Sequence, residues 1–268
     1  MAPTFAPLVL LGAGHMGGAL IEGWSSRAVV APGDLLILDP APGEAARRAA
    51  GEGARLDPSE EDLAAAKAAV LAVRPQGWRK AASDLARRLP IDAKVISIMA
   101  GVPLAGIAAL FAPRPVCRVM PNLPAAIGEG AAALFSPDPA AAEAARALFS
   151  PIAEVIEVED EALLHAVTAV AGSGPAYLYA FAEALAAAGE KAGLPSVAAA
   201  RMARRTVAGA AALMARSSEP PTAMRQAVAS KGGTTEAALE VLLAPGGLCD
   251  LLSSAVERAA ARSRELAL

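Results

Sequence analysis

Residues 8–18 read LVLLGAGHMGG, a short apolar run followed at once by a glycine-rich segment. The first four residues are typical of a buried parallel strand, and a helical pattern continues over residues 19–24. A GxGxxG motif between a strand and a helix predicts a loop that binds a dinucleotide. We expect Gly12 to make the tight turn, Gly14 to let a pyrophosphate approach the backbone, and Gly17 to let the helix pack on the strand.

The second expected strand, residues 35–38, ends at Asp39, which is the acidic residue that such a motif requires about 20 positions further on. A carboxylate there would accept hydrogen bonds from ribose hydroxyls and repel a 2′-phosphate, which favours NADH over NADPH. A plain turn at Asp39-Pro40 is the alternative. Arg47 and Arg48 lie close enough in sequence to leave NADPH open.

The first half of the chain alternates strand and helix patterns. Further strands are expected at 69–73, 94–98 and 116–120, helices at 44–50, 60–66, 78–89 and 104–110, and edge strands at 131–135 and 154–158. This alternation predicts an α/β fold with a Rossmann-type, doubly wound parallel sheet and right-handed crossovers.

The second half of the chain shows only helical patterns. They cover 161–170, 175–192, 197–215, 222–229, 235–243 and 248–266, and several are apolar around much of their circumference. Such helices must be buried, and thin helices cannot bury this much apolar surface within one monomer. We therefore expect a dinucleotide-binding domain over residues 1–160 and an all-helical dimerisation and substrate-binding domain over residues 161–268, which forms an interwoven homodimer.

Composition excludes several classes of function. The net charge of −3 gives no electrostatic reason to bind nucleic acid or an anionic membrane. The two cysteines lie far apart, and with two histidines a four-ligand zinc site is not expected, so we expect no metal. Free thiols and an N-terminus without a basic signal region favour the cytoplasm.

The apolar stretch 162–188 could be mistaken for a membrane span. It is interrupted by the GSGP sequence at residues 172–175 and carries His165 and Glu183. A spanning helix needs about 20 apolar residues without such breaks. We expect two buried helices that meet at a glycine turn, and His165 as a satisfied interface histidine.

Small and turn-forming residues follow the other expected strands. The exits are VRPQ at 73–76, SIMAG at 97–101 and MPN at 120–122. Ligands of such sheets bind outside the carboxyl ends of the strands, so these segments are expected to border the cofactor. Asn122 could bond a nicotinamide carboxamide or ribose, or it could only cap a turn.

Residues 230–239 read SKGGTTEAAL, two glycines followed by two threonines that open a helical run. Free backbone N–H groups, the positive end of a helix and two hydroxyls meet there, which is typical of a site for a small anion such as a carboxylate. The alternative is an ordinary helix start with Thr234 as the N-cap.

Five motifs together, in this order, resemble the pyrroline-5-carboxylate reductase family, whose members catalyse the last step of proline biosynthesis. They are GAGHMG at 12–17, AVRPQ at 72–76, RVMPN at 118–122, AGSGPAY at 171–177 and SKGGTT at 230–235. The resemblance runs nearly end to end. It implies that NADH or NADPH delivers a hydride to the imine carbon of a cyclic, carboxylate-bearing substrate.

The resemblance also implies roles for particular residues. Cofactor contacts would come from Leu11, Gly12, Ala13, Gly14, His15, Met16, Ala72, Val73, Arg74, Pro75, Ile98, Met99 and Ala100, with Asn122 nearby; substrate contacts would come from Glu161, Ser230, Gly233, Thr234 and Thr235. The Thr235 hydroxyl is the candidate partner of the ring nitrogen. The family's helical domains interlock, the substrate loop of one subunit faces its partner's nucleotide domain, and decameric rings of dimers are typical.

The sequence departs from the family at several positions. His15, Arg74 and Lys231 stand where members usually have Asn, Lys and Pro, and Asp39-Pro40 replaces a pair that often holds a 2′-phosphate. Arg74 keeps its positive charge, whereas Asp39 puts the common NADPH preference in doubt.

Two other functions remain open from the residues alone. A different imine or hydroxyacid reductase of similar fold would typically carry a catalytic Lys on the first interdomain helix, but residues 162–189 contain no Lys. A non-catalytic nucleotide-binding regulator would keep the glycine loop without needing the GGTT segment.

Overall fold

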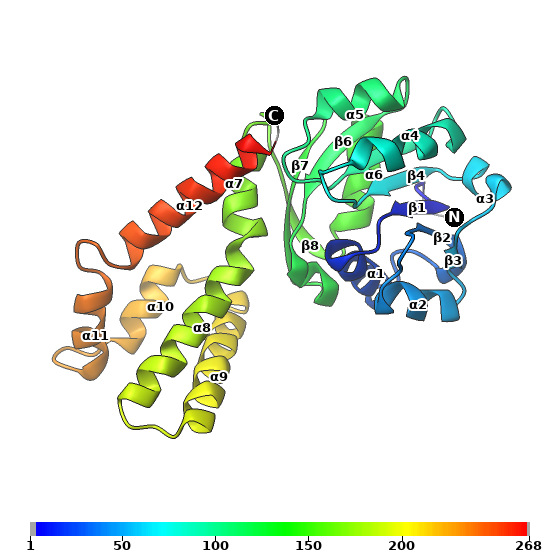
Figure 1. The fold of residues 1–268 in the computed structure, drawn as a ribbon. Coiled ribbons are helices and arrows are strands. Elements are labelled where there is room, and N and C mark those ends of the chain that lie inside the picture. The colour runs from blue at the N-terminus through cyan, green and yellow to red at the C-terminus, as the bar shows by residue number, and fades with distance from the viewer. Residues whose placement is uncertain (1–3, 267–268) are drawn as a thin grey trace. The chain divides into compact units, whose positions relative to one another are not determined.

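The computed structural model describes residues 4–266, and the chain divides into two compact units (Figure 1). The sheet unit comprises the chain as far as Ser173 and again from Ala259. The helical unit comprises Gly174–Arg258. The expected domain boundary between residues 160 and 161 stays a prediction.

The sheet unit is built on one sheet of eight strands in the order β3-β2-β1-β4-β5-β6-β7-β8. The strands are β1 (Leu8–Leu11), β2 (Leu35–Leu38), β3 (Arg55–Leu56), β4 (Ala68–Leu71), β5 (Lys94–Ser97), β6 (Val116–Met120), β7 (Gly130–Phe135) and β8 (Ala153–Glu157). The first six run parallel to one another, and β7 pairs antiparallel with β6. The Rossmann-type fold is confirmed, with an antiparallel step before its last two strands.

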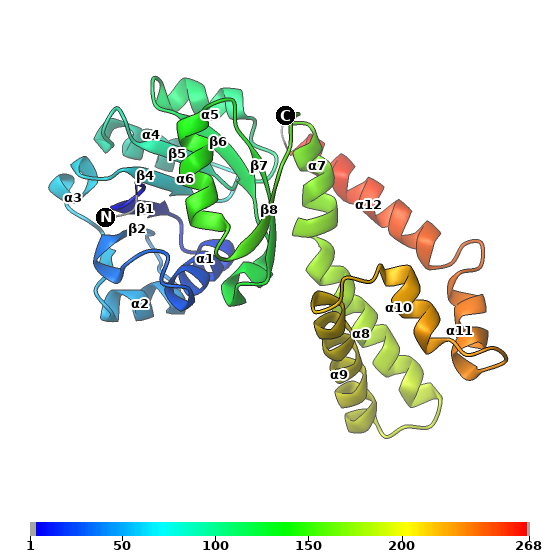
Figure 2. The same cartoon turned by 180° about the vertical axis from the view of Figure 1, so that it is seen from behind.

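Helices cover both faces of this sheet. They are α1 (His15–Ser26), α2 (Glu44–Gly51), α3 (Glu60–Ala64), α4 (Trp78–Arg88), α5 (Leu104–Phe111) and α6 (Pro139–Phe149), with 3-10 turns η1 (Pro32–Asp34) and η2 (Leu123–Ile127). Successive strand residues face opposite sides, so Leu8 and Leu10 join the core under α1 and α6 while Val9 joins the core under α4 and α5. Figure 2 shows α6 in front of the sheet.

Trp24 anchors the part of the core that lies between the sheet and helices α1 and α6. Trp24 of α1 is 1% exposed, donates its indole N–H to the Leu148 carbonyl at 3.0 Å, and meets the Phe149 ring edge-on at 6.4 Å. These contacts fix α1, and therefore its N-terminus, over the end of β1.

Two elements of the sheet unit, β3 and α6, were not predicted from the sequence. β3 has only two residues and both are exposed, so it has no apolar pattern. The start of α6 carries a readable signal, because Asp138 accepts hydrogen bonds from the Ala140 and Ala141 N–H groups and Pro139 occupies the first turn.

The helical unit contains α8 (Gly174–Lys191), α9 (Ser196–Ala215), α10 (Pro221–Val228), α11 (Thr234–Leu242) and the greater part of α12 (Leu248–Glu265). α8 and α9 pack together as a hairpin (Figure 1). As expected, the single chain does not bury the apolar surface of these helices, and α8, α10 and α11 contain no buried residue. Their apolar side chains, such as Leu178, Tyr179 and Val241, stand exposed and need a partner surface.

The expected glycine turn at residues 172–175 is also wrong. α7 (Leu163–Val167) runs into a π-helical turn, η3 (Thr168–Gly172), and α8 begins two residues later. The Ser173 N–H donates to the Thr168 carbonyl at 2.9 Å, the bond that defines the π-helical turn. Pro175 lies in the first turn of α8, where backbone N–H groups have no acceptor within the helix, so the missing N–H of proline costs no hydrogen bond.

Among residues 4–266, no helix is long and apolar enough to cross a bilayer.

Candidate functional site

The glycine loop lies between β1 and α1 at the carboxyl edge of the parallel strands. Gly12 has φ +97°, and a Cβ there would lie 2.8 Å from the Ala72 carbonyl oxygen. A Cβ on Gly17 would lie 2.2 Å from the Gly12 carbonyl oxygen, so only glycine lets α1 approach the loop this closely. A Cβ on Gly14 would meet nothing within 4 Å, which leaves open space in front of the loop.

The N-terminus of α1 faces that open space without a cap. Gly14 is its N-cap residue and offers no side-chain hydrogen bond, and the first turn holds no acidic residue. The uncapped N–H groups and the helix dipole favour an anion at this end. Gly14 and His15 are both exposed.

Asp39, directly after β2, bonds the glycine loop. Its Oδ2 accepts a hydrogen bond from the Ala13 N–H at 2.5 Å, and its Oδ1 accepts one from the Ala41 N–H at 2.8 Å. The carboxylate is therefore fixed beside the loop by two backbone groups.

A cavity of about 500 Å³ opens beside the loop. Its lining includes Ala13, Gly14, His15, Gly18, Glu22 and Gly43. Arg48, which the sequence left as a possible phosphate contact, pairs with Glu22 at 2.9 Å on this side of the molecule. The cavity thus joins the glycine loop to the segment that follows β2.

The exits of β4 and β5 lie along the same edge. The Ala72 N–H donates to the Leu11 carbonyl at 2.8 Å, and the Ile98 N–H donates to the Leu71 carbonyl at 3.1 Å. Val73 and Pro75 are half-buried, Arg74 is exposed, and Ile98 and Met99 are buried. The structure therefore brings the expected cofactor residues of both exits to one edge with Gly12.

The amide of Asn122 is used by the protein itself. Its Oδ1 accepts from the Ala131 N–H at 2.9 Å, and its Nδ2 donates to the Ala171 carbonyl of the π-helical turn at 3.2 Å. Asn122 is 9% exposed and makes no side-chain cap on η2. It ties the start of β7 to the π-helical turn.

Glu161 lies just before α7 and is held by two groups. Its Oε1 accepts from the Leu104 N–H at 2.6 Å and from Arg118 Nη1 at 2.8 Å. Arg118, on β6, also donates to the Met99 carbonyl at 3.1 Å. The resemblance named Glu161 as a substrate ligand, and its bonds to Leu104 and Arg118 were not foreseen.

His165 on α7 has a protein partner within the sheet unit. Its Nδ1 lies 2.9 Å from the Ser263 hydroxyl. Burial lowers the pKa of His165, and the positive charges of Arg118 and Arg264 lower it further, against the opposing effect of Glu161. Burial and the two arginines therefore favour the neutral ring, which does not suit His165 to act as an acid.

Residues 230–235 form the start of α11 in the helical unit. Gly232 has φ +73°, and Gly233, rather than Thr234, is the N-cap. The alternative that Thr234 caps the helix is therefore wrong, since the helix already includes it. The N–H groups of Thr234 and Thr235 have no acceptor in the part of the chain described, so this loop keeps free donors at a helix N-terminus.

Glu236 is a member of this loop that the sequence did not point to. Its Oε2 accepts a hydrogen bond from the Gly232 N–H at 2.6 Å. An acidic residue three positions after an N-cap is a familiar signal, which could have been read from GTTE. It fixes the turn and adds a negative charge near the free N–H groups.

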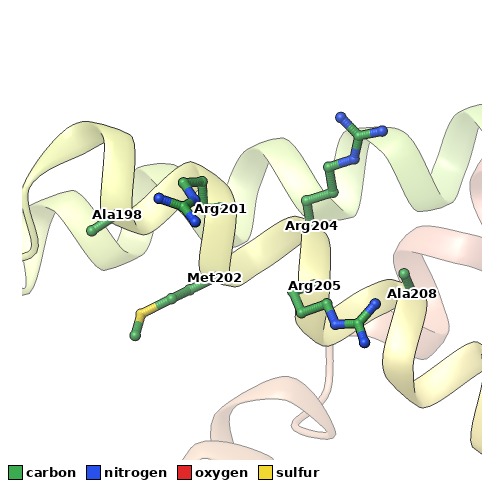
Figure 3. Close-up of a pocket in the computed structure, with 6 residues that line it drawn as sticks. All are labelled: Ala198, Arg201, Met202, Arg204, Arg205 and Ala208. Carbon is green, nitrogen blue, oxygen red and sulfur yellow. The ribbon is translucent and has the colours of Figure 1, made fainter.

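A larger cavity, of about 630 Å³, lies against α9 (Figure 3). Its lining residues all come from this one helix: Ala198, Arg201, Met202, Arg204, Arg205 and Ala208. It contains none of the expected site residues, and its arginines splay in different directions in Figure 3. We regard it as an exposed helix face of the single chain, and place the cofactor site at the glycine loop.

In the described part of the chain, no three of the His, Cys, Asp and Glu side chains are grouped so that they could hold a metal ion.

Comparison with family models gives two matches. Residues 161–266 match the model described as pyrroline-5-carboxylate reductase dimerisation. Residues 7–101 match the model described as NADP oxidoreductase, coenzyme F420-dependent. The helical half is therefore a self-association domain, and the first half is an oxidoreductase nucleotide domain.

Curated relatives and solved structures cover nearly the whole chain. The pyrroline-5-carboxylate reductase of Pseudomonas aeruginosa is 38% identical over 97% of this chain and 96% of its own, and that of Synechocystis is 35% identical over 97% of each. The structure of the Coxiella burnetii enzyme matches with a TM-score of 0.87 and 28% identity, over 98% of this chain and 99% of that one. The Plasmodium falciparum enzyme with NADP bound shares the fold, with a TM-score of 0.83 at 24% identity over 98% of both chains.

Proposed function

The chain belongs to the pyrroline-5-carboxylate reductase family, and we propose that it reduces 1-pyrroline-5-carboxylate to L-proline, the last step of proline biosynthesis. Nicotinamide C4 of NADH or NADPH would supply the hydride to the imine carbon. The observation that carries the proposal is the glycine loop, where the turn at Gly12, the open space at Gly14 and the uncapped α1 N-terminus fit a dinucleotide pyrophosphate.

We propose that the cofactor contacts run along the strand exits. Residues 11–16 would contact the dinucleotide, with the uncapped N–H groups at the start of α1 facing the pyrophosphate, because the Gly12 and Ala13 N–H groups already donate to Leu38 and Asp39. Residues 72–75 would border the dinucleotide, and residues 98–100 would line the nicotinamide. Arg74 is exposed and has no ion-pair partner in the described chain, so its charge is free to meet a phosphate. Asn122 would act at the nicotinamide end by holding the start of β7 and not by extending to the cofactor itself. Its amide already bonds Ala131 and Ala171.

For the choice of cofactor we propose NADH. The Asp39 carboxylate is fixed beside the loop by Ala13 and Ala41, and each of its oxygens keeps acceptor capacity for a ribose hydroxyl. A 2′-phosphate would meet this charge, while Arg48 is engaged with Glu22.

The substrate carboxylate would be held at the start of α11. The free N–H groups of Thr234 and Thr235, with Ser230 and Gly233 shaping the turn, offer donors to a carboxylate, and Lys231 is exposed beside them. The Thr235 hydroxyl, which is half-buried, would accept a hydrogen bond from the protonated ring nitrogen. These groups would orient the imine carbon, and no general acid is needed when the imine binds protonated.

We extend the proposal to the assembly. The exposed apolar helices support an interwoven homodimer in which the substrate loop of one subunit faces the nucleotide domain of its partner, and a decamer built as a ring of dimers. The two cysteines are unpaired, which fits a reducing cytoplasm.

The test is the oxidation of NADH and of NADPH by the purified protein, with and without 1-pyrroline-5-carboxylate. We expect oxidation that depends on the imine and is faster with NADH. Binding of NADH without any turnover of this imine would reject the proposed reaction.

A further inference from the structure

We propose that Arg118 is a positioning residue that holds the connection between β5 and α5 in the shape in which it would line the nicotinamide. The inference rests on the proposed function, which places residues 98–100 against the cofactor. Arg118 is only 3% exposed, and its Nη2 donates to the Met99 carbonyl at 3.1 Å. No other side chain in the described residues bonds that carbonyl.

The same guanidinium also reaches the far end of the connection. Its Nη1 donates to Glu161 Oε1 at 2.8 Å, and that oxygen accepts the Leu104 N–H at 2.6 Å. Leu104 is the first residue of α5, whose N-cap, Pro103, provides no side-chain hydrogen bond. Arg118 therefore holds the connection at Met99 directly and at Leu104 through Glu161.

The remaining residues of the connection have little freedom of their own. The Met99 N–H lies 3.3 Å from Ser97 Oγ, and Met99 is 2% exposed. Gly101 has φ +74°, and a Cβ there would lie 3.1 Å from the Ser263 carbonyl oxygen. Several contacts thus fix this segment. The guanidinium of Arg118 holds the Met99 carbonyl directly and Leu104 through Glu161.

A role in stability alone does not account for this arrangement. Arg118 Nε is buried without a hydrogen-bond partner in the described chain, and an unsatisfied buried donor opposes folding. A well-packed apolar side chain commonly serves stability as well as a buried ion pair does. The two terminal nitrogens of the Arg118 guanidinium instead match two acceptors, the Met99 carbonyl and Glu161, and these two contacts set the shape of the connection.

The experiment compares Arg118→Met with Arg114→Met. Arg114 is a matched control because it is also partly buried and donates to the carbonyls of Ala86, Leu89, Pro90 and Phe111, at the opposite end of β6 from the strand exits. The first readout is hydrogen exchange of residues 98–104 in the full-length protein without cofactor. We expect exchange about tenfold faster in Arg118→Met, and unchanged exchange there in Arg114→Met.

The second readout is kinetic. We expect Arg118→Met to lower kcat about 100-fold while the Kd for NADH stays close to that of the unaltered protein, because a small misplacement of the reacting groups slows the chemical step. The isotope effect with C4-deuterated NADH should rise, since hydride transfer becomes rate-limiting. Arg118→Lys keeps the charge without the fork and should show the same pattern; it replaces Arg118→Met if that variant does not fold.

Unchanged exchange at residues 98–104 would overturn the inference, whatever the activity. Equal losses of kcat in Arg118→Met and Arg114→Met, with no change of isotope effect, would also overturn it by showing a structural role only. If the unaltered protein fails to turn over the imine, the proposed function falls, and hydrogen exchange still decides whether Arg118 holds the connection.

Discussion

At the scale of single residues, the site depends on polar groups whose backbone contacts fix them before any ligand arrives. Asp39 is held by Ala13 and Ala41, Asn122 by Ala131 and Ala171, and Glu236 by Gly232. Such fixed dipoles and charges lower the reorganisation that binding requires. The residues with most freedom to act on a ligand are those with unused donors, Thr234 and Thr235.

Asp39→Ser tests the choice of cofactor. Serine removes the fixed charge but keeps a short hydrogen-bonding side chain, so kcat/KM with NADPH should rise relative to NADH by about tenfold, corresponding to about 1.4 kcal/mol. Steady-state kinetics with both cofactors measure the ratio. An unaltered ratio would show that Asp39 does not face the ribose.

Thr235→Ala tests the proposed contact to the ring nitrogen. Loss of one hydrogen bond to a charged group should lower kcat/KM for the imine by about 10- to 100-fold, with little effect on the Kd for NADH. Thr222→Ala, an exposed threonine on α10, is the matched control and should behave as the unaltered protein. Equal kinetics for the two variants would remove Thr235 from the site.

At the scale of elements, packing decides how closely the glycine loop and α1 can approach. Gly12 and Gly17 allow backbone contacts that any side chain would block, and Trp24 fixes the same helix from its other end. These contacts set the direction of the α1 N-terminus toward the open space at Gly14.

Gly17→Ala tests this packing. The added Cβ would lie 2.2 Å from the Gly12 carbonyl oxygen, so α1 must shift, and we expect the free energy of unfolding to fall by about 1–3 kcal/mol and NADH binding to weaken. Chemical denaturation and NADH titration measure both. Gly51→Ala, where a Cβ meets nothing within 4 Å, is the control; if Gly17→Ala matched it, close packing at the loop would not be required.

The elements that the sequence predicted are those with a continuous apolar pattern. The strands at residues 8–11, 35–38 and 116–120 stand where expected because each is a buried run with turn-forming residues after it. The π-helical turn could not be predicted because the sequence of residues 168–172 does not differ from that of an α-helix. Only the hydrogen bond from the Ser173 N–H to the Thr168 carbonyl distinguishes the turn from an α-helix. The pairing of Arg118 with Glu161 joins residues 43 apart in sequence, which no local pattern reveals.

At the scale of the whole molecule, the apolar surface of the helical unit is the main feature that the single chain leaves unexplained. Tyr179 is 62% exposed, Val241 74% and Leu251 65%, although each lies on a helix of the self-association domain. Exposed apolar patches of this kind are typical of interfaces, which agrees with the match to a dimerisation model and supports the proposed homodimer.

Leu178→Asp tests the interface. A charge placed on the exposed apolar face of α8 should weaken association and shift the mass measured by light scattering from dimer or decamer toward monomer. Ile91→Asp, on an exposed apolar residue of the sheet unit, is the control and should leave the mass unchanged. A monomeric unaltered protein would contradict the interwoven dimer.

The most direct test of the central claim follows the hydride itself. NADH carrying deuterium at nicotinamide C4, in the transferred position, is incubated with the protein and 1-pyrroline-5-carboxylate, and the product is examined by mass spectrometry and NMR. We predict L-proline with one deuterium at the former imine carbon, and a loss of this product in Thr235→Ala. Consumption of NADH without labelled proline would contradict the account.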